Sequence, residues 1–144
     1  MKTQLIKVLI ILLFVAPAVQ AGEPHFRDRS EGEQLALLDV AKVAKGPTAA
    51  ALAIGVINEM MDARGKVGPS NYPYSEEVFN RAIFVLGELQ ETSAIELLDQ
   101  IVRFNYPYNS GEHNSAWAGN ALAKIAMGLR ARCETHLLKP DTQK

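Results

Sequence analysis

A four-residue motif, Asn-Tyr-Pro-Tyr, occurs twice in this chain, at residues 71–74 and again at residues 105–108. The two copies lie 34 residues apart, and internal similarity at this spacing is typical of helical repeats built from pairs of helices. Proline restricts the backbone of the residue before it, so each copy is expected to form a loop. The motif therefore predicts a helical unit lying between the two loops.

Residues 75–103, between the two motifs, contain two amphipathic segments. Apolar residues recur in both at i, i+3, i+4 and i+7, which is the period of an α-helix. The apolar positions are Val78, Phe79, Ala82, Ile83, Leu86 and Leu89 in the first segment, and Ala94, Ile95, Leu97, Leu98, Ile101 and Val102 in the second. Because only a minimal turn separates the segments, we expect a helical hairpin in which each helix has one face to bury.

Three further segments have helical periodicity, so the chain is expected to be all-α with about five helices. Their expected ranges are 31–45, 47–63 and 112–138. Ser30 is a candidate N-cap of the first, with Glu33 at the capping-box position. Gly46 ends that helix, and Pro47 starts the next at once, since proline is tolerated in a first turn. The helix over 47–63 is apolar nearly all round and contains Gly55, which predicts a central helix with close backbone contacts.

The hairpin resembles a HEAT-like repeat of the short type found in phycocyanobilin lyase subunits. The matching residues are Val78, Ala82, Val85, Leu86, Gly87, Leu89, Ala94, Ile95 and Leu98. In this pattern Ala82 and Gly87 would allow neighbouring helices to approach. Leu86, Leu89 and Leu98 would fill the layer between repeats. The chain departs from the pattern at residues 90–91, where Gly-Asp is usual, and at Phe79, where arginine is usual.

A second, weaker copy of the pattern occurs in the last helix, and a third lies around residues 36–48. The second copy comprises Ala118, Ala121, Leu122, Ala123 and Ile125. The resemblance implies a short α-solenoid of about two and a half HEAT-like hairpins over residues 31–138. Residues 22–30 are polar and show no period, so they are expected to be a flexible N-terminus. Residues 139–144 are expected to be a polar tail.

Residues 1–21 have the features of a secretory signal peptide. Two lysines precede an apolar run at residues 8–16, Pro17 ends the run, and small side chains lead up to Ala21. An uncleaved membrane anchor is the alternative, but the run is shorter than the ~20 apolar residues that a spanning helix needs. We therefore expect an exported chain, periplasmic or secreted, which begins at Gly22 and has no membrane span after cleavage.

Charge and cysteine content narrow the choice of partner. Without residues 1–21 the chain has 13 basic and 16 acidic side chains, a net charge of −3. General binding to nucleic acid or anionic lipid is not expected, because both require clustered positive charge. Cys133 is the single cysteine, so no intramolecular disulfide can form. A partly buried thiol is the simplest expectation for it, with an intermolecular bridge or a reactive thiol as alternatives.

The sequence contains no recognisable catalytic constellation. His25, His113 and His136 are scattered, without the spacing of a metal site. No nucleophile elbow, P-loop or dinucleotide fingerprint occurs. Carboxylates such as Glu88 and Glu96 fall opposite the apolar stripe of the hairpin, where a solvated surface is expected. We therefore expect no metal, no cofactor and no catalytic residue.

These observations favour a non-catalytic protein–protein interaction or scaffold module, which binds a protein or peptide partner on its repeat surface. One alternative is an accessory structural subunit of an envelope complex, and another is an enzyme of the HEAT-like lyase type with an unrecognised site.

If the two Tyr-Pro-Tyr loops emerge at the same edge, their aromatic residues form a candidate binding ridge. Its members would be Tyr72, Tyr74, Tyr106, Tyr108, His113 and Trp117. Alternatively, the tyrosines only cap their helices and pack on each other.

Overall fold

The computed structural model describes residues 25–104 and 113–137. In this part of the chain the backbone forms five α-helices and three short 3-10 helices. In chain order they are η1 (Phe26–Asp28), α2 (Glu31–Ala44), α3 (Pro47–Ala63), η2 (Pro69–Asn71), α4 (Glu76–Leu89), η3 (Thr92–Ala94), α5 (Ile95–Phe104) and α6 (His113–Leu137). The prediction of an all-α protein with five helices is confirmed. None of the described helices is both long and apolar enough to cross a bilayer.

Local signals set the helix ends where the sequence predicts them. The Glu33 carboxylate accepts hydrogen bonds from the Ser30 backbone N–H at 2.9 Å and from the Ser30 hydroxyl at 2.6 Å. These bonds hold the pKa of Glu33 below its usual value. Between α2 and α3 the chain turns through Lys45, with φ of 55°, and Gly46, with φ of 107°. Only glycine adopts such a conformation as Gly46 without strain, and Pro47 then begins α3 directly.

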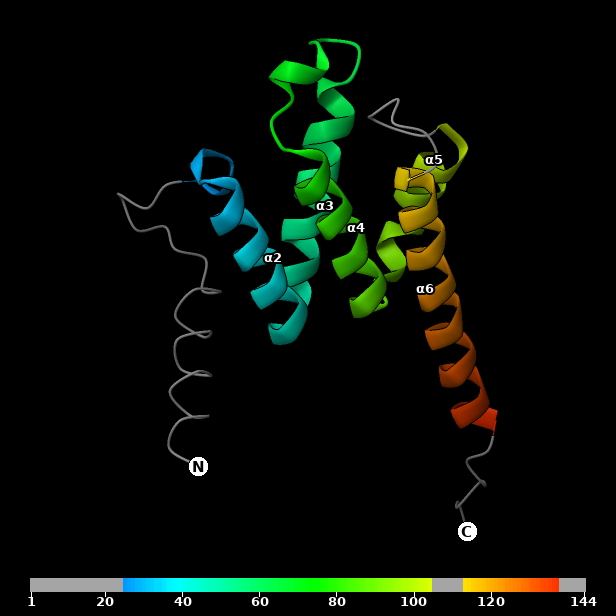
Figure 1. Cartoon of the computed structure of the whole chain (residues 1–144). Helices are drawn as coiled ribbons and strands as arrows, with labels where there is room; N and C mark the ends of the chain where they lie inside the picture. Colours follow the sequence, from blue (N-terminus) through cyan, green and yellow to red (C-terminus); the bar gives the residue numbers. More distant parts are fainter. Residues whose placement is uncertain (1–24, 105–112, 138–144) are drawn as a thin grey trace, which may run out of the picture.

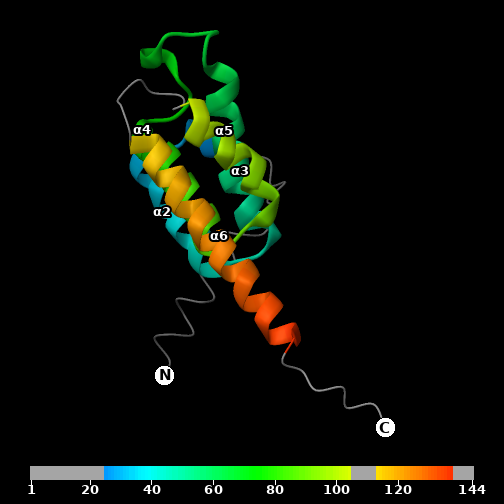
Figure 2. The same ribbon diagram turned by 90° about the vertical axis from the view of Figure 1, so that its right-hand side faces the viewer.

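The five helices lie in two rows. Figures 1 and 2 show α2, α4 and α6 side by side and running in the same direction, with α3 and α5 running in the opposite direction behind them. Helix α4 packs against α2, α3 and α6, whereas α5 makes its most extensive helix contact with α6. The central helix is therefore α4. The prediction that the helix over residues 47–63, which is α3, is central was wrong. An apolar surface all round α3 was a misleading signal, because Ala51 is exposed and Leu52, Ile54 and Met61 are only half-buried.

The hydrophobic core follows α4 and extends into every other α-helix. Its largest fully buried side chains include Phe79, Leu38, Ile57, Met60, Ile83, Leu86, Leu98, Ile101 and Ile125. Of the three leucines that were predicted to fill the layer between repeats, Leu86 and Leu98 are completely buried and Leu89 is half-buried. The second half of α6 continues past the ends of the other helices, and residues 129–135 are all exposed (Figure 2).

Candidate interaction surface

The predicted ridge of aromatic residues begins with a tyrosine that is part of the core. Tyr74 is 5% exposed, and its ring lies 5.7 Å from the ring of Phe26, centroid to centroid. Its hydroxyl donates a hydrogen bond of 2.9 Å to Oε2 of Glu59. Burial and this hydrogen bond raise the pKa of Tyr74 above its usual range. Tyr74 therefore ties η1 and α3 to the loop before α4, and its ring does not form a binding surface.

The other members of the ridge lie in different surroundings. Tyr72 is half-buried and packs against the core, while His113 is exposed at the start of α6. Tyr106 and Tyr108 lie outside the described residues, so their position beside the first Tyr-Pro-Tyr loop stays a prediction. Trp117 is 41% exposed, and it has a defined aromatic partner on the surface.

Trp117 of α6 packs edge-to-face against Phe84 of α4. Their ring centroids are 5.9 Å apart and the rings are nearly perpendicular, at 89°, which is a favourable arrangement for two aromatic rings. Two lysines approach the same Phe84 ring, Lys42 from α2 with its Nζ at 5.3 Å and Lys124 from α6 with its Nζ at 4.7 Å. Both distances allow cation–π attraction, so all three helices of the front row meet at Phe84.

A shallow groove of about 280 Å³ lies beside this aromatic pair. It is lined by Phe84, Trp117, Asn120, Ala121, Ala123, Lys124 and Met127. Met127 is 63% exposed, an unusual exposure for a large apolar side chain, and Lys124 is the only charged residue in the lining. We call this feature the Phe84–Trp117 groove.

Ion pairs hold the side chains around the groove. Lys124 pairs with Glu88, and this hydrogen bond holds the pKa of Glu88 below its usual value. On the other side, Arg81 of α4 bonds to Asp39 of α2, with Nη1 and Oδ1 2.6 Å apart. Each pair joins α4 to a neighbour in the front row, so the position of Phe84 depends on both flanking helices.

Sequence reasoning identified Trp117 but missed Phe84, Lys42, Lys124 and Met127. Phe84 was missed because core residues are expected on the apolar stripe of a helix, and Phe84 lies outside the stripe of its own helix. A large aromatic side chain outside the stripe of an amphipathic helix is itself a signal of a surface role. The two lysines carry no such signal, since an isolated lysine on a helix is ordinary.

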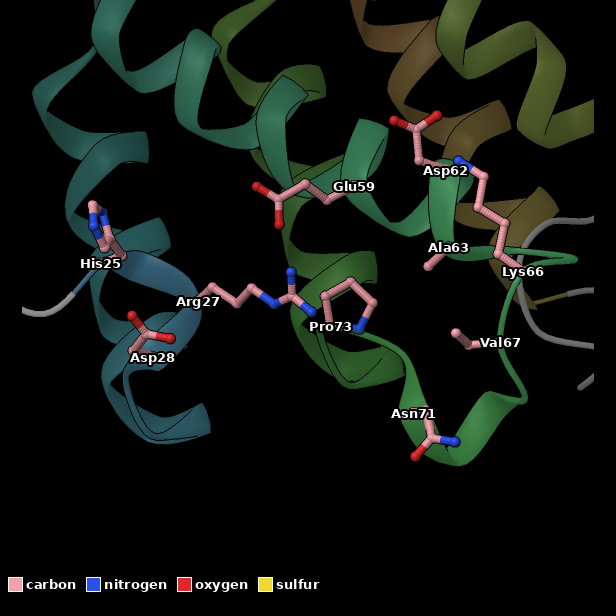
Figure 3. Close-up of a pocket in the computed structure, with 10 residues that line it drawn as sticks. All are labelled: His25, Arg27, Asp28, Glu59, Asp62, Ala63, Lys66, Val67, Asn71 and Pro73. Carbon is pink, nitrogen blue, oxygen red and sulfur yellow. The ribbon is translucent and has the colours of Figure 1, made fainter.

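A second cavity, larger and polar, lies between η1, the end of α3 and the loop that follows α3 (Figure 3). Its volume is about 590 Å³. It is lined by His25, Arg27, Asp28, Glu59, Asp62, Ala63, Lys66, Val67, Asn71 and Pro73. We call it the polar cleft.

Neither cavity brings the groups of a metal site together. Within residues 25–104 and 113–137, no cluster of three or more His, Cys, Asp and Glu side chains could hold a metal ion. Cys133 is exposed on the projecting part of α6, which corrects the expectation that it is partly buried. Comparison of the chain with protein-family models, with curated proteins and with solved structures finds no match.

Proposed function

We propose that this protein is a non-catalytic interaction module of the cell envelope or secreted space, which binds a protein or peptide partner in the Phe84–Trp117 groove. The observation that carries the proposal is the pairing of an exposed tryptophan with a phenylalanine that also has two lysines over its ring. The groove offers a partner an apolar side-chain site with a cation at its rim.

The composition of the groove supports this function. Tryptophan and arginine dominate binding hot spots, and aromatic residues and methionine are enriched at interface cores. Trp117 and Met127 together present large apolar side chains to solvent. An apolar surface next to polar residues often marks an interaction site. The interlocked aromatic pair would lose little side-chain freedom when a partner binds.

We further propose that the helices form a short HEAT-like stack. In this interpretation α2 with α3 and α4 with α5 are two successive hairpins, and α6 begins a third. The parallel front row of α2, α4 and α6, with α3 and α5 behind it, supports this arrangement (Figures 1 and 2). Within it, α5 packs mainly on α6 of the next unit and not on α4 of its own. Stacked repeats present continuous surfaces made by equivalent helices of each unit, and the Phe84–Trp117 groove lies between two such helices.

The location proposed for the protein follows from the signal-peptide pattern of residues 1–21. Its partner would then be another protein of the envelope or secreted space, or an exposed peptide segment of one.

The test uses the exported protein and two variants, captured with chemical cross-linking from the envelope and secreted fractions. Trp117→Ala removes the exposed wall of the groove. Ile95→Ala removes an apolar side chain of similar exposure, 39% against 41%, on a different helix. We expect wild type and Ile95→Ala to capture the same partner, while capture by Trp117→Ala falls at least about tenfold, as for a hot-spot residue.

A structural control separates binding from folding. Loss of the ring pair should lower stability by about 0.5 to 1.5 kcal/mol, in addition to the loss of the buried part of the indole surface. The circular dichroism spectrum of Trp117→Ala should remain helical, because Trp117 lies at the surface and not in the core. Trp117 is the only tryptophan in the chain, so its fluorescence reports directly on the groove, and a blue shift is expected when the partner binds. Capture by a folded Trp117→Ala variant at the wild-type level would contradict the proposal.

A further inference from the structure

The polar cleft has the size of a small-molecule site and lies apart from the Phe84–Trp117 groove. Its volume of about 590 Å³ is within the range of roughly 300 to 1,000 Å³ that is usual for ligand pockets. One side is formed by η1 and the other by the end of α3 with the loop that follows it (Figure 3). Arg27 lines the cleft from η1 and Glu59 lines it from α3, so opposite charges reach the cleft from two separate elements.

The α3 side of the cleft is negatively charged. Glu59 and Asp62 lie near the C-terminal end of α3, and the last turn of this helix contains no basic residue. The C-terminal end of a helix carries a partial negative charge, which normally attracts cations. The two carboxylates add to this charge, and in the described part of the chain neither forms an ion pair. Lys66, in the loop after α3, brings a cation to the same side of the cleft, so Glu59, at the end that faces η1, is the carboxylate placed to receive a positive group (Figure 3).

The side chain of Glu59 is held in a fixed position. Its Oε2 accepts the hydrogen bond from the buried Tyr74 hydroxyl at 2.9 Å. Because Tyr74 is 5% exposed and packed against Phe26, the carboxylate is anchored to the core. Its second oxygen remains available to a ligand in the cleft. An acceptor that is already positioned favours specific binding, because its side chain loses little conformational entropy when a ligand binds.

A cation faces Glu59 from the other side. Figure 3 shows the guanidinium of Arg27 and the carboxylate of Glu59 directed toward one another across the cleft. No ion pair joins these two side chains in residues 25–104, so opposite charges are held apart with space between them. A guanidinium is well suited to bind a carboxylate through two parallel hydrogen bonds.

We propose that the polar cleft binds a small zwitterion of the α-amino-acid class, with its carboxylate on Arg27 and its ammonium group on Glu59. The ligand fits because its ammonium and carboxylate groups are attached to the same carbon, so that it can bridge two side chains that do not reach each other. Its own side chain would extend toward Asp62, Lys66 and Asn71, which line the rest of the cleft. Those three residues offer a second carboxylate, an ammonium and an amide, and they would select for a polar side chain.

The test is isothermal titration calorimetry on the exported protein. The probes are glycine, L-alanine, L-glutamate, L-glutamine and L-lysine, and the single-charge references are acetate and methylammonium. At least one amino acid should bind saturably, and at least tenfold more tightly than either reference. Arg27→Gln and Glu59→Gln should each weaken that binding at least tenfold.

Two matched variants remove the same charges elsewhere. Lys45→Gln removes a cation at the end of α2, and Glu96→Gln removes an exposed carboxylate on α5; both should bind the amino acid as wild type does. Melting curves within a few degrees of wild type will show that the cleft variants remain folded. The proposal is overturned if no amino acid saturates, if acetate binds as tightly as the best amino acid, or if Arg27→Gln binds normally. None of these outcomes bears on the Phe84–Trp117 groove.

Discussion

Gly87 of α4 lies so close to Ala121 of α6 that a β-carbon at position 87 would be 2.8 Å from the Cα of Ala121 and 3.0 Å from its Cβ. The two helices therefore touch through their backbones, because no side chain separates them at this point. The expectation that Gly87 allows a neighbouring helix to approach is confirmed. Gly55, which was expected to do the same for α3, has no neighbouring atom within 4 Å of such a β-carbon.

The first prediction compares alanine at these two glycines. Gly87→Ala should lower the free energy of unfolding by about 1 to 3 kcal/mol, because α4 and α6 must move apart to admit the methyl group. Gly55→Ala should raise it by about 0.5 to 1 kcal/mol, since alanine is the better helix former and the site has room. Urea denaturation measures both. If both alanines lower the free energy of unfolding to the same extent, the close contact with Ala121 is not the reason that position 87 requires glycine.

The second prediction concerns the core. Leu86→Ala and Leu98→Ala should each lower the free energy of unfolding by about 2 to 5 kcal/mol, because both side chains are completely buried and leave a cavity. Gln100→Ala, at an exposed position of α5, should change it by less than about 0.5 kcal/mol. Chemical denaturation of the three variants is the measurement. A large loss from Gln100→Ala would mean that α5 is rotated relative to the structure.

The third prediction concerns Tyr74 and pH. Tyr74→Phe keeps the ring but removes the hydrogen bond to the Glu59 carboxylate, which should cost about 1.5 to 3 kcal/mol at neutral pH. The pKa of Tyr74 is raised in the folded protein, so its contribution is complete below the ordinary tyrosine pKa of about 10. Above that pH the unfolded chain loses the proton first, and stability falls.

The measurement for Tyr74 is the unfolding free energy of both proteins at neutral and at alkaline pH. The difference between wild type and Tyr74→Phe should shrink as the pH rises above about 10. Other tyrosines and lysines titrate in the same range, but they are common to both proteins and cancel in the comparison. A difference that stays constant with pH would exclude the raised pKa.

The fourth prediction is that the exported protein begins at Gly22. The charged start, apolar run and small residues of positions 1–21 favour cleavage after Ala21. Intact-mass measurement of protein from the envelope or secreted fraction should show the mass of residues 22–144. Recovery of protein that retains Met1 from either fraction would show that the segment is not cleaved.

Much of the secondary structure could be predicted because its causes are local. Ser30 with Glu33, and Gly46 with Pro47, act within one turn of the helix ends that they determine. The apolar period of residues 76–89 likewise predicts which face of α4 is buried, and Phe79 and Leu86 are indeed in the core. These signals depend on neighbours three or four residues away, so a single sequence contains them in full.

The candidate sites depend on contacts that no local pattern describes. Phe84 meets Trp117, and Glu59 meets Tyr74, only because the helices that carry them pack at particular rotations and distances. Those rotations follow from the whole core, including the backbone contact between Gly87 and Ala121. The sequence by itself thus determined five helices and the buried face of α4, whereas Ile95, which was expected on the buried face of α5, is 39% exposed. Tertiary packing decided that α4 is central, that Tyr74 is buried and that Trp117 lines a groove, because each of these outcomes requires several helices to be in place at once.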